Sequence, residues 1–385
     1  MKRVLLGLVF SLALIGCTGK DESPAKTEGG KQAADPTAGK AFVERECKGC
    51  HGLDGKSNAP GIPHLAGQRE RYLVAAIDAY RQGKRFHSAL RQIAGRMSDT
   101  DSRNVAAYFA SQPPFAAVST PNARQFSPYD AGKKLAMACV KCHGEDGNSK
   151  GPGIPNLAGQ QPRYLVDAMR EYLHAERKQA PMHPMLRNLS GLEMESLALY
   201  FASQTPAEHK APPGADPAAG EPLSAVCGGC HGARGVSTDS ATPSLANQDA
   251  RYLVEAIKAY RTTRKREKMR VYVSGLSDKE ISEIAAFYAV QKSKPAEKGQ
   301  TIVQDLTDKC ARCHAADADI PGLAVPRING QDKDYLIMAL RAYRDDRRES
   351  SMMHKMSLPY SDSIIESVSS YYASHAETAK APAAQ

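Results

Sequence analysis

The chain has 385 residues, of which 42% are hydrophobic and 24% charged, a composition typical of a globular protein of two to four domains. Only 6% of the residues are aromatic and tryptophan is absent, so a domain of ordinary size would have a thin core unless a buried cofactor fills it. The formal net charge is +9, but the basic residues do not form runs interleaved with aromatic residues, so we expect no nucleic-acid partner.

The first 16 residues have the pattern of a signal peptide. Two basic residues precede an apolar run from Val4 to Ile15, which is too short to cross a bilayer as a permanent helix. The run ends in Leu-Ile-Gly-Cys at residues 14–17, and this ending resembles the bacterial lipoprotein signal, in which the cysteine is acylated and becomes the first mature residue. We therefore expect Cys17 to be a lipid attachment site, followed by a flexible tether over residues 17–36.

The lipoprotein resemblance implies a protein of the bacterial cell envelope that faces the periplasm. Thr18 follows the cysteine in place of Asp, which favours the outer membrane. The alternative is that Cys17 is an unpaired cysteine in an ordinary signal peptide.

Four Cys-x-x-Cys-His motifs contain all the remaining cysteines. On a helix, positions i, i+3 and i+4 share one face, so two thiols can add to the vinyl groups of one porphyrin edge while the histidine reaches the iron. We therefore predict four covalently bound haem c groups. The predicted attachment residues are Cys47 and Cys50, Cys139 and Cys142, Cys227 and Cys230, and Cys310 and Cys313, and the predicted axial iron ligands are His51, His143, His231 and His314.

Three other uses of paired cysteines suit this pattern poorly. A zinc knuckle needs two half-sites close together in the sequence, and a disulfide framework would not recur at domain-sized intervals. A thioredoxin-like redox pair gives no reason for an adjacent histidine in every copy.

The segments after the motifs repeat as well. The first two copies contain Pro-x-Leu-Ala-Gly-Gln and then Arg-Tyr-Leu-Val, and the last two contain close variants. Such self-similarity predicts tandem domains, joined by linkers rich in Pro, Ala and Lys. The predicted domains span residues 37–112, 128–204, 217–292 and 296–375, and a disordered tail follows over residues 376–385.

We expect each domain to be all-α, with three helices joined by loops. The first helix carries the Cys-His motif, and the second begins at the repeated Tyr-Leu pair and keeps tyrosines such as Tyr72 and Tyr80 on one stripe. The third follows an N-cap serine such as Ser98 or Ser277 and ends in two adjacent aromatic residues. The tyrosine stripe and the aromatic pairs are expected in the core.

A methionine at a fixed place in each of the last three domains suggests the second axial ligand of the iron. Met182, Met269 and Met353 stand at the same distance before the residue that precedes the third helix. A thioether ligand raises the reduction potential relative to a second histidine. The alternative is that these side chains fill gaps in a thin core, and in the last domain Met352 and Met356 compete with Met353.

The first domain has Leu90 in this register. Three outcomes are open: His87 ligates the iron, Met97 reaches it after a shift of the loop, or the iron stays open. We favour His87, against the alternative that it is a solvated residue of a basic loop.

The repeat resembles class I cytochrome c, and in particular the domains of the two-haem cytochrome c4 family. The resemblance rests on Cys-x-x-Cys-His followed by Gly-x-x-Gly, on Pro-x-Leu-Ala-Gly-Gln-x-x-Arg-Tyr-Leu and on a methionine ahead of Leu-Ser-Asp, and it covers nearly all of residues 37–375. It implies two such proteins in series, with haems paired so that their propionate edges face each other. The first domain departs by lacking the methionine, and the fourth has Ala315-Ala316-Asp317 where Gly-x-x-Gly is expected.

The resemblance implies an electron carrier whose partners are redox proteins, such as a quinol-oxidising complex of the respiratory chain, a terminal oxidase or a reductase. We therefore expect electron transfer without catalysis. The alternative is an oxidoreductase with peroxidase, thiosulfate or nitrogen-oxide chemistry at an open haem in the first domain, where Arg85, His87 and Arg91 would flank the open face. A haem-based sensor would need an output domain, for which the four repeats leave no residues.

Overall fold

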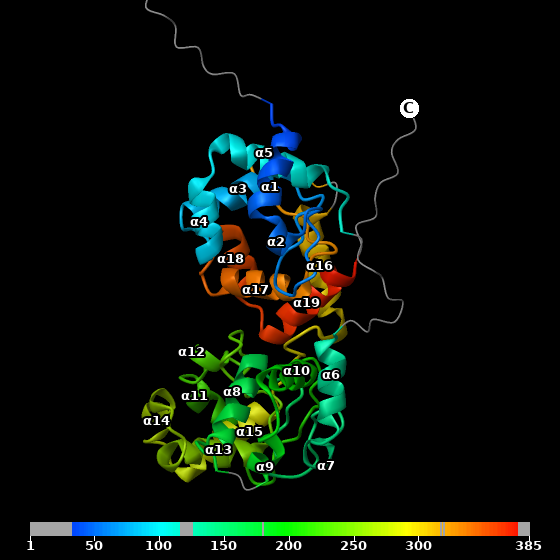
Figure 1. Cartoon of the computed structure of the whole chain (residues 1–385). Helices are drawn as coiled ribbons and strands as arrows, with labels where there is room; N and C mark the ends of the chain where they lie inside the picture. The colour runs from blue at the N-terminus through cyan, green and yellow to red at the C-terminus, as the bar shows by residue number, and fades with distance from the viewer. Residues whose placement is uncertain (1–32, 116–125, 179–180, 316–317, 319, 376–385) are drawn as a thin grey trace, which may run out of the picture. The chain divides into compact units, whose positions relative to one another are not determined.

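Helices make up all the regular secondary structure in the computed structural model, which describes residues 33–115, 126–178, 181–315, 318 and 320–375 (Figure 1). The predicted all-α fold is therefore confirmed. The predicted signal peptide (1–16), the lipid attachment site Cys17, the tether up to residue 32 and the tail (376–385) lie outside the described residues. From Asp35 onward the chain forms one compact unit, and in its described part we find no helix with the length and apolar character needed to span a membrane.

The helices follow one order that repeats four times. The first domain contains α1 (Pro36–Glu46), α2 (Lys48–His51), α3 (Glu70–Arg81), α4 (Ser88–Arg96) and α5 (Asp99–Ser111). The second contains α6 (Pro128–Ala136), α7 (Val140–His143), α8 (Pro162–Leu173), α9 (Met182–Leu186) and α10 (Gly191–Ala202). The third contains α11 (Pro217–Ser224), α12 (Gly228–His231), α13 (Ala250–Thr262), α14 (Glu267–Val273) and α15 (Asp278–Ala289). The fourth contains the 3-10 turn η1 (Gly299–Thr301), α16 (Ile302–His314), α17 (Lys333–Arg344), α18 (Ser351–Ser357) and α19 (Asp362–Ser374).

The prediction of three helices per domain was incomplete in two respects. In the first three domains the helix that carries the Cys-His motif is interrupted near the first cysteine, whereas α16 runs through its motif without a break. The segment that carries the methionine, which we expected to be a loop, forms a short additional helix in each domain: α4, α9, α14 or α18.

Side-chain caps explain where the last helix of each domain begins, that is, where α5, α10, α15 and α19 begin. Ser98, Ser190, Ser277 and Ser361 are the N-cap residues, as the sequence predicts, and each hydroxyl accepts a hydrogen bond from a backbone N–H of the first turn. In the first three domains an acidic side chain at the third helical position accepts a hydrogen bond from the N-cap N–H, which completes a capping box.

A glycine lets the first and last helices of a domain cross in close contact. A Cβ atom on Gly39 of α1 would lie 2.0 Å from the carbonyl oxygen of Asn104 in α5, and a Cβ atom on Gly132 would lie equally close to the Ser196 carbonyl. Gly220 of α11 approaches Glu283 of α15 in the same way. In the fourth domain Leu306 of α16 packs against α19 within an apolar cluster instead.

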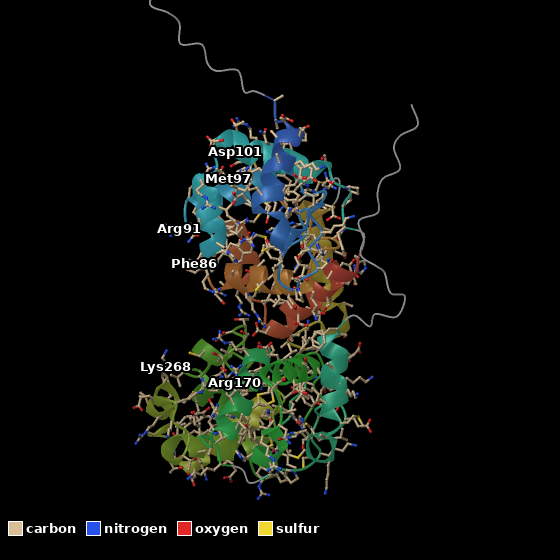
Figure 2. The ribbon with its side chains drawn as sticks, in the orientation of Figure 1. Phe86, Arg91, Met97, Asp101, Arg170 and Lys268 are labelled. Carbon is tan, nitrogen blue, oxygen red and sulfur yellow. The ribbon has the colours of Figure 1, made fainter. Side chains whose placement is uncertain are left out.

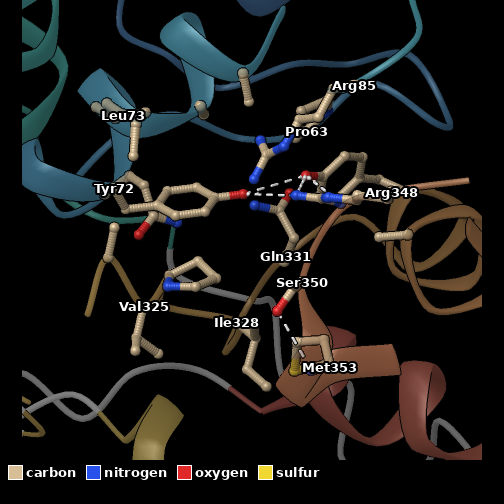
Figure 3. Close-up of a pocket in the computed structure, with 18 of the residues that line it drawn as sticks. Pro63, Tyr72, Leu73, Arg85, Val325, Ile328, Gln331, Arg348, Ser350 and Met353 are labelled. Carbon is tan, nitrogen blue, oxygen red and sulfur yellow. Dashed lines mark hydrogen bonds between the residues drawn. The ribbon is translucent and has the colours of Figure 1, made fainter. Parts of the chain in front are cut away.

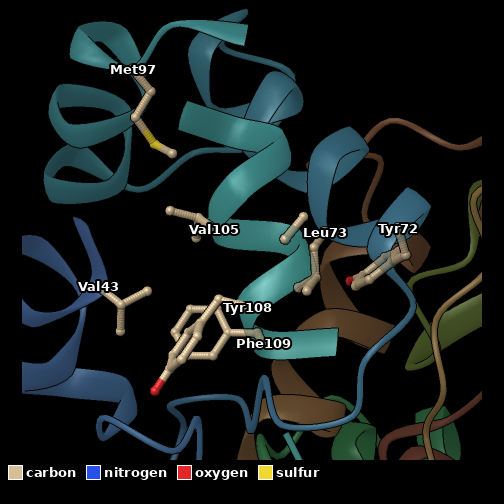
Figure 4. Packing of buried hydrophobic residues seen from close by; sticks show 8 residues of the cluster. Val43, Tyr72, Leu73, Met97, Val105, Tyr108 and Phe109 are labelled. Atoms are coloured by element: carbon tan, nitrogen blue, oxygen red, sulfur yellow. The ribbon is translucent and has the colours of Figure 1, made fainter. Parts of the chain in front are cut away.

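Each domain has a small core built on its last helix. In the first domain, Val43 of α1 and Leu73 of α3 pack with Val105 and Phe109 of α5, and Figure 4 shows this cluster gathered around α5. The predicted burial of the adjacent aromatic residues is confirmed for Tyr108 and Phe109 and for their counterparts in the second and third domains; in the fourth, Tyr372 is buried and Tyr371 partly so.

The second and fourth domains share one core. Leu199 of α10 belongs to the cluster that Ile364 and Val368 of α19 form with Leu306. Two hydrogen bonds join the same domains: the Ser363 N–H donates to Glu195 Oε2 at 2.8 Å, and the Ser367 hydroxyl donates to the Phe126 carbonyl at 2.6 Å.

The glutamine of the repeated Pro-x-Leu-Ala-Gly-Gln segment joins domains in pairs. Gln68 of the first domain accepts the Arg327 N–H at 2.8 Å and donates to the Arg327 carbonyl at 3.0 Å. Gln331 of the fourth domain reciprocates, accepting the His64 N–H at 2.7 Å and donating to the His64 carbonyl at 3.0 Å. The two exchanges are equivalent, as expected of a contact with approximate two-fold symmetry.

The same reciprocal exchange joins the second and third domains. Gln160 binds both backbone groups of Ser244, and Gln248 binds both backbone groups of Asn156, at distances of 2.7 to 2.9 Å. The first domain thus pairs with the fourth (the outer pair) and the second with the third (the inner pair). The sequence resembles two two-domain proteins in series and leaves the spatial arrangement open; in the structure the pairs are nested.

Candidate haem-binding sites

The histidine of every Cys-His motif is held by a backbone carbonyl. The Nδ1 atom lies 3.0 Å from the Pro63 carbonyl for His51, 2.9 Å from Pro155 for His143, and 2.8 Å from Pro243 and Pro326 for His231 and His314. Burial lowers the pKa of all four imidazoles, so the neutral form is favoured. A neutral imidazole that donates through Nδ1 presents the lone pair of Nε2, which is the arrangement found at histidine metal ligands.

The cysteines of the motifs are not disulfide-bonded. The first cysteine of each motif is partly buried, and burial raises the pKa of its thiol, to about 11 for Cys47. Redox-active cysteines instead have a lowered thiol pKa, so a redox role does not suit these thiols. In the described part of the chain we also find no group of three His, Cys, Asp or Glu side chains arranged to hold a metal ion.

A single cavity of about 1060 Å³ joins the two motifs of the outer pair. It reaches Cys47 and His51 of the first domain and Cys310 and His314 of the fourth. Single-ligand pockets are usually about 300–1,000 Å³, so the size suits two large groups side by side. Mostly apolar side chains line it, with thiols and imidazoles at both ends, as haem c requires.

The candidate axial methionines occupy equivalent helical positions in two domains. Met269 is the third residue of α14, Met353 is the third residue of α18, and both are partly buried. Met182 is the first residue of α9 and is also partly buried. Met353 lines the cavity of the outer pair, where Figure 3 shows it beside its N-cap Ser350, but Met352 and Met356 line the same cavity.

The first domain has Leu90 at this helical position, and Leu90 also lines the cavity. His87 is the N-cap of α4, and its Nδ1 accepts the Leu90 N–H at 3.3 Å. Iron ligation through Nε2 would require a proton on Nδ1 and would therefore break this cap. Met97 packs in the core beside Val105 (Figure 4), and Phe86 before His87 is 90% exposed (Figure 2).

The fourth domain also differs at the loop after its motif. Ala315 has a φ of −59°, whereas Gly52, Gly144 and Gly232 in the same position have φ between +73° and +83°. An alanine avoids the left-handed region, so the backbone leaves the motif in another direction. Ala316 and Asp317 lie outside the described residues.

Sequence reasoning missed one arginine per domain that meets the tyrosine stripe. Each arginine stands a few residues after the helix that carries the tyrosines (α3, α8, α13 or α17), and an alignment of the four repeats shows this regularity. In each domain the guanidinium carbon lies 4.6 to 5.9 Å from the centre of one or two tyrosine rings. The four residues are Arg85, Arg177, Arg264 and Arg348.

Three of the four helical repeats match known family models. The family model described as "Cytochrome c" matches residues 36–113 and 129–205, and the family model described as "Cytochrome C oxidase, cbb3-type, subunit III" matches residues 215–287. Cytochrome c4 of Pseudomonas aeruginosa is 33% identical over 210 residues, which are 52% of this chain and 98% of that protein.

Two further similarities extend the comparison. A protein named "Thiosulfate dehydrogenase electron acceptor" from Stutzerimonas stutzeri is 31% identical over 52% of this chain and 93% of its own length. A solved structure of cytochrome c4 from Pseudomonas stutzeri is 29% identical and aligns with 43% of this chain and 99% of its own, with a TM-score of 0.39. On the identity and coverage of the Pseudomonas aeruginosa protein, the chain belongs to the cytochrome c4 family of class I c-type cytochromes and is a multihaem electron-transfer protein.

Proposed function

We propose that the chain carries four haem c groups and relays electrons between membrane respiratory complexes and periplasmic or terminal acceptors. The observation that carries this proposal is the shared cavity of the outer pair, which two Cys-x-x-Cys-His motifs line together. Two haems in one cavity would exchange electrons without diffusion, and the covalent linkage of four domains keeps the second pair at high effective concentration.

The residues take the following roles in this proposal. Bound haem c supplies a one-electron iron couple, and the protein sets its potential. The paired thiols of each motif would hold the porphyrin through thioether bonds, and the proline carbonyl keeps the proton on Nδ1, which leaves the lone pair of Nε2 available to an iron. Met182, Met269 and Met353 would each supply a thioether ligand to an iron, which would raise its potential, and the apolar walls of the outer cavity would exclude water.

The proposed partners are redox proteins at a membrane, namely a quinol-oxidising complex on the donor side and a terminal oxidase or reductase on the acceptor side. The relative named as an electron acceptor of thiosulfate dehydrogenase supports a role in receiving electrons from another protein. Acylated Cys17 would hold the chain in the cell envelope, on the periplasmic side and by preference at the outer membrane.

Haem staining and haem quantification test the core of the proposal. Four haems per chain should remain attached after boiling and denaturing electrophoresis, because thioether bonds survive denaturation. Replacement of both cysteines of one motif should remove one haem of the four. Absence of covalent haem would overturn the proposal.

The location is tested separately. The Cys17→Ser variant should move from the membrane fraction to the soluble periplasmic fraction while keeping its haem content. Continued membrane association of this variant would contradict the lipid anchor without touching the electron-transfer role.

Leu90 favours a second candidate function, an oxidoreductase with an open iron in the first domain. A leucine side chain cannot ligate iron, and His87 holds its Nδ1 in the cap of α4. Electron paramagnetic resonance of the oxidised protein separates the candidates: four low-spin haems that change in His87→Ala indicate a carrier with His87 as ligand. One high-spin haem that is insensitive to His87→Ala indicates an open iron and favours catalysis there.

A further inference from the structure

Each domain pair has a cluster of two arginines and four tyrosines at its interface, and all of these side chains are buried or half-buried. The outer cluster consists of Tyr72, Tyr80, Arg85, Tyr335, Tyr343 and Arg348. The inner cluster consists of the corresponding residues Tyr164, Tyr172, Arg177, Tyr252, Tyr260 and Arg264, of which Arg264 stands one residue earlier in its repeat. Both domains of a pair contribute equally to each cluster.

The guanidinium of Arg348 is the centre of the outer cluster. It is 8% exposed and crosses the domain boundary, donating from Nη2 to the Tyr72 hydroxyl at 3.1 Å, and Figure 3 shows Arg85 beside this contact. Its Nε is buried and has no hydrogen-bond partner among the described residues. All six side chains of the outer cluster line the shared cavity.

The two positive charges of the outer cluster lack a carboxylate. In the described part of the chain, no carboxylate oxygen lies within 4.0 Å of Arg85 or Arg348, and the nearby Glu349 binds Lys84 instead. The arginines consequently lower the pKa of Tyr72, although burial acts in the opposite direction. Two cations in an apolar cavity are costly unless an anion joins them, and the propionates are the only anionic groups of haem.

The inner cluster differs by one carboxylate. Glu171 of α8 forms an ion pair with Arg177 of its own domain and reaches across the interface to Arg266, whose Nη2 lies 2.6 Å from Oε1. The same repeat position holds Ala79, Ala259 or Ala342 in the other domains. Glu171 leaves part of the site free, because Arg177 Nη2 is buried without a hydrogen-bond partner among the described residues.

We propose that both clusters bind haem propionates, and that Glu171 occupies part of the inner cluster so that the inner haems have lower reduction potentials than the cluster alone would give them. This proposal rests on the proposed function, because it requires bound haem. A positive charge near the iron stabilises the reduced state and a negative charge stabilises the oxidised state, so Glu171 lowers the inner potentials relative to those that Arg177 and Arg264 alone would give. Arg266, its partner across the interface, opposes part of this effect.

Potentiometric titration of the full-length haem protein, fitted with four one-electron steps, tests the proposal. Glu171→Gln should shift two of the four midpoint potentials upward and leave the other two unchanged. Glu176→Gln is the matched control, because it removes the same charge from an exposed position in the same segment and should shift none. No shift in Glu171→Gln, or an equal shift of all four steps, would overturn the proposal.

The arginines give an independent test with the opposite sign. Arg348→Gln should shift two midpoint potentials downward, and these should be the two that Glu171→Gln leaves unchanged. Arg348→Lys keeps the charge and should retain most of the native potentials, whereas a purely structural role would make both variants equally defective. Arg347→Gln, at an exposed neighbouring position, is the control for nearby charge.

Haem content separates failure of the proposed function from failure of the propionate site. If the native protein lacks covalent haem, the proposed function fails and the titration cannot be made. If all variants carry four haems and Arg348→Gln and Arg348→Lys both keep native potentials, the electron carrier stands and the propionate site is wrong.

Discussion

The two domains of the outer pair differ in one side chain at a matched position of the short helix. Leu90 occupies the third position of α4, as Met353 does in α18, and both side chains line the same cavity. Both domains have the short helix, so the two outer sites differ in whether its third residue is a leucine or a methionine.

A single substitution should add the missing ligand. We expect Leu90→Met to raise the reduction potential of the first haem and to give it the spectrum of a His–Met low-spin iron, because a thioether would stand where the other domains have one. The measurement is paramagnetic resonance together with potentiometric titration. Ile93→Met, one turn further along α4 and also at the cavity, is the control and should leave the first haem unchanged.

If Leu90→Met and Ile93→Met behave alike, the third position of α4 is not equivalent to that of α18 as a ligand position. If neither changes the spectrum while His87→Ala does, the histidine is the ligand and Leu90 is only a wall of the cavity.

Within a domain, the elements are fixed by close approach of the first helix to the last. Gly132 lies against the Ser196 carbonyl, where no side-chain atom can fit without moving backbone. Gly191, at the start of the partner helix α10, has open space on the side where a Cβ atom would stand, with no other atom within 4 Å. We therefore expect an alanine to be tolerated at Gly191 and not at Gly132.

Gly132→Ala should destabilise the second domain by about 1–3 kcal/mol, because the added methyl forces α6 away from α10. Gly191→Ala should be neutral or stabilising by up to about 1 kcal/mol, because it only restricts the unfolded chain. Thermal unfolding followed by circular dichroism measures both. Equal effects of the two substitutions would contradict the close helix crossing.

The capping box of α5 should make stability depend on pH. Hydrogen bonds from the Ser98 hydroxyl and then from its N–H lower the pKa of Asp101 in the folded state. The group's contribution is thus complete above the unfolded pKa, which is about 4 for Asp, and is lost as the pH falls through the lowered folded value. Asp101→Asn should lower the melting temperature at pH 7, and its difference from the native protein should shrink below about pH 4.

A double-mutant cycle with Ser98→Ala checks the cause. Ser98→Ala alone should cost about 1 kcal/mol, and the double variant should cost less than the sum of the single ones. A strictly additive result would mean that Asp101 acts through another group.

At the scale of the whole molecule, the domains pair in a nested order. The reciprocal glutamine contacts link the first domain to the fourth, across 267 residues between His64 and Gln331. Gln331→Ala should therefore expose a backbone amide in the first domain, far away in the sequence. We expect hydrogen exchange at the His64 amide to rise roughly fivefold or more, since the lost bond is worth about 1 kcal/mol.

Gln248→Ala is the matched variant of the inner pair. It should affect the Asn156 amide and leave that of His64 unchanged. If Gln331→Ala instead loosened the third domain, the domains would pair in series and the nested arrangement would be wrong.

Local features of this fold were predictable from the sequence, whereas its long-range contacts were not. The Cys-His motifs, the serine caps and the second helix depend on residues a few positions apart, so pattern and spacing predict them. The short helices α4, α9, α14 and α18 were missed because they are too brief to show a clear apolar period. The pairing of Gln68 with Arg327 was missed because all four repeats have this glutamine and it contacts backbone groups, so nothing local selects the partner.

The arginines illustrate an intermediate case. An alignment of the repeats places Arg85, Arg177 and Arg348 in one register and Arg264 one residue earlier, but an arginine in a basic loop is ordinarily solvated. The partner domain closes over these side chains, so that Arg177 and Arg348 are buried and Arg85 and Arg264 are half-buried, which only the fold reveals.

The nested order also has a consequence in time. At about 5–20 residues per second, the ribosome needs roughly 13 to 53 s to make the 267 residues that separate His64 from Gln331. The inner pair waits for a much shorter stretch, since Asn156 and Gln248 are 92 residues apart. The first domain is made earliest and its partner latest, so we expect its apolar half-cavity to stay uncovered longest.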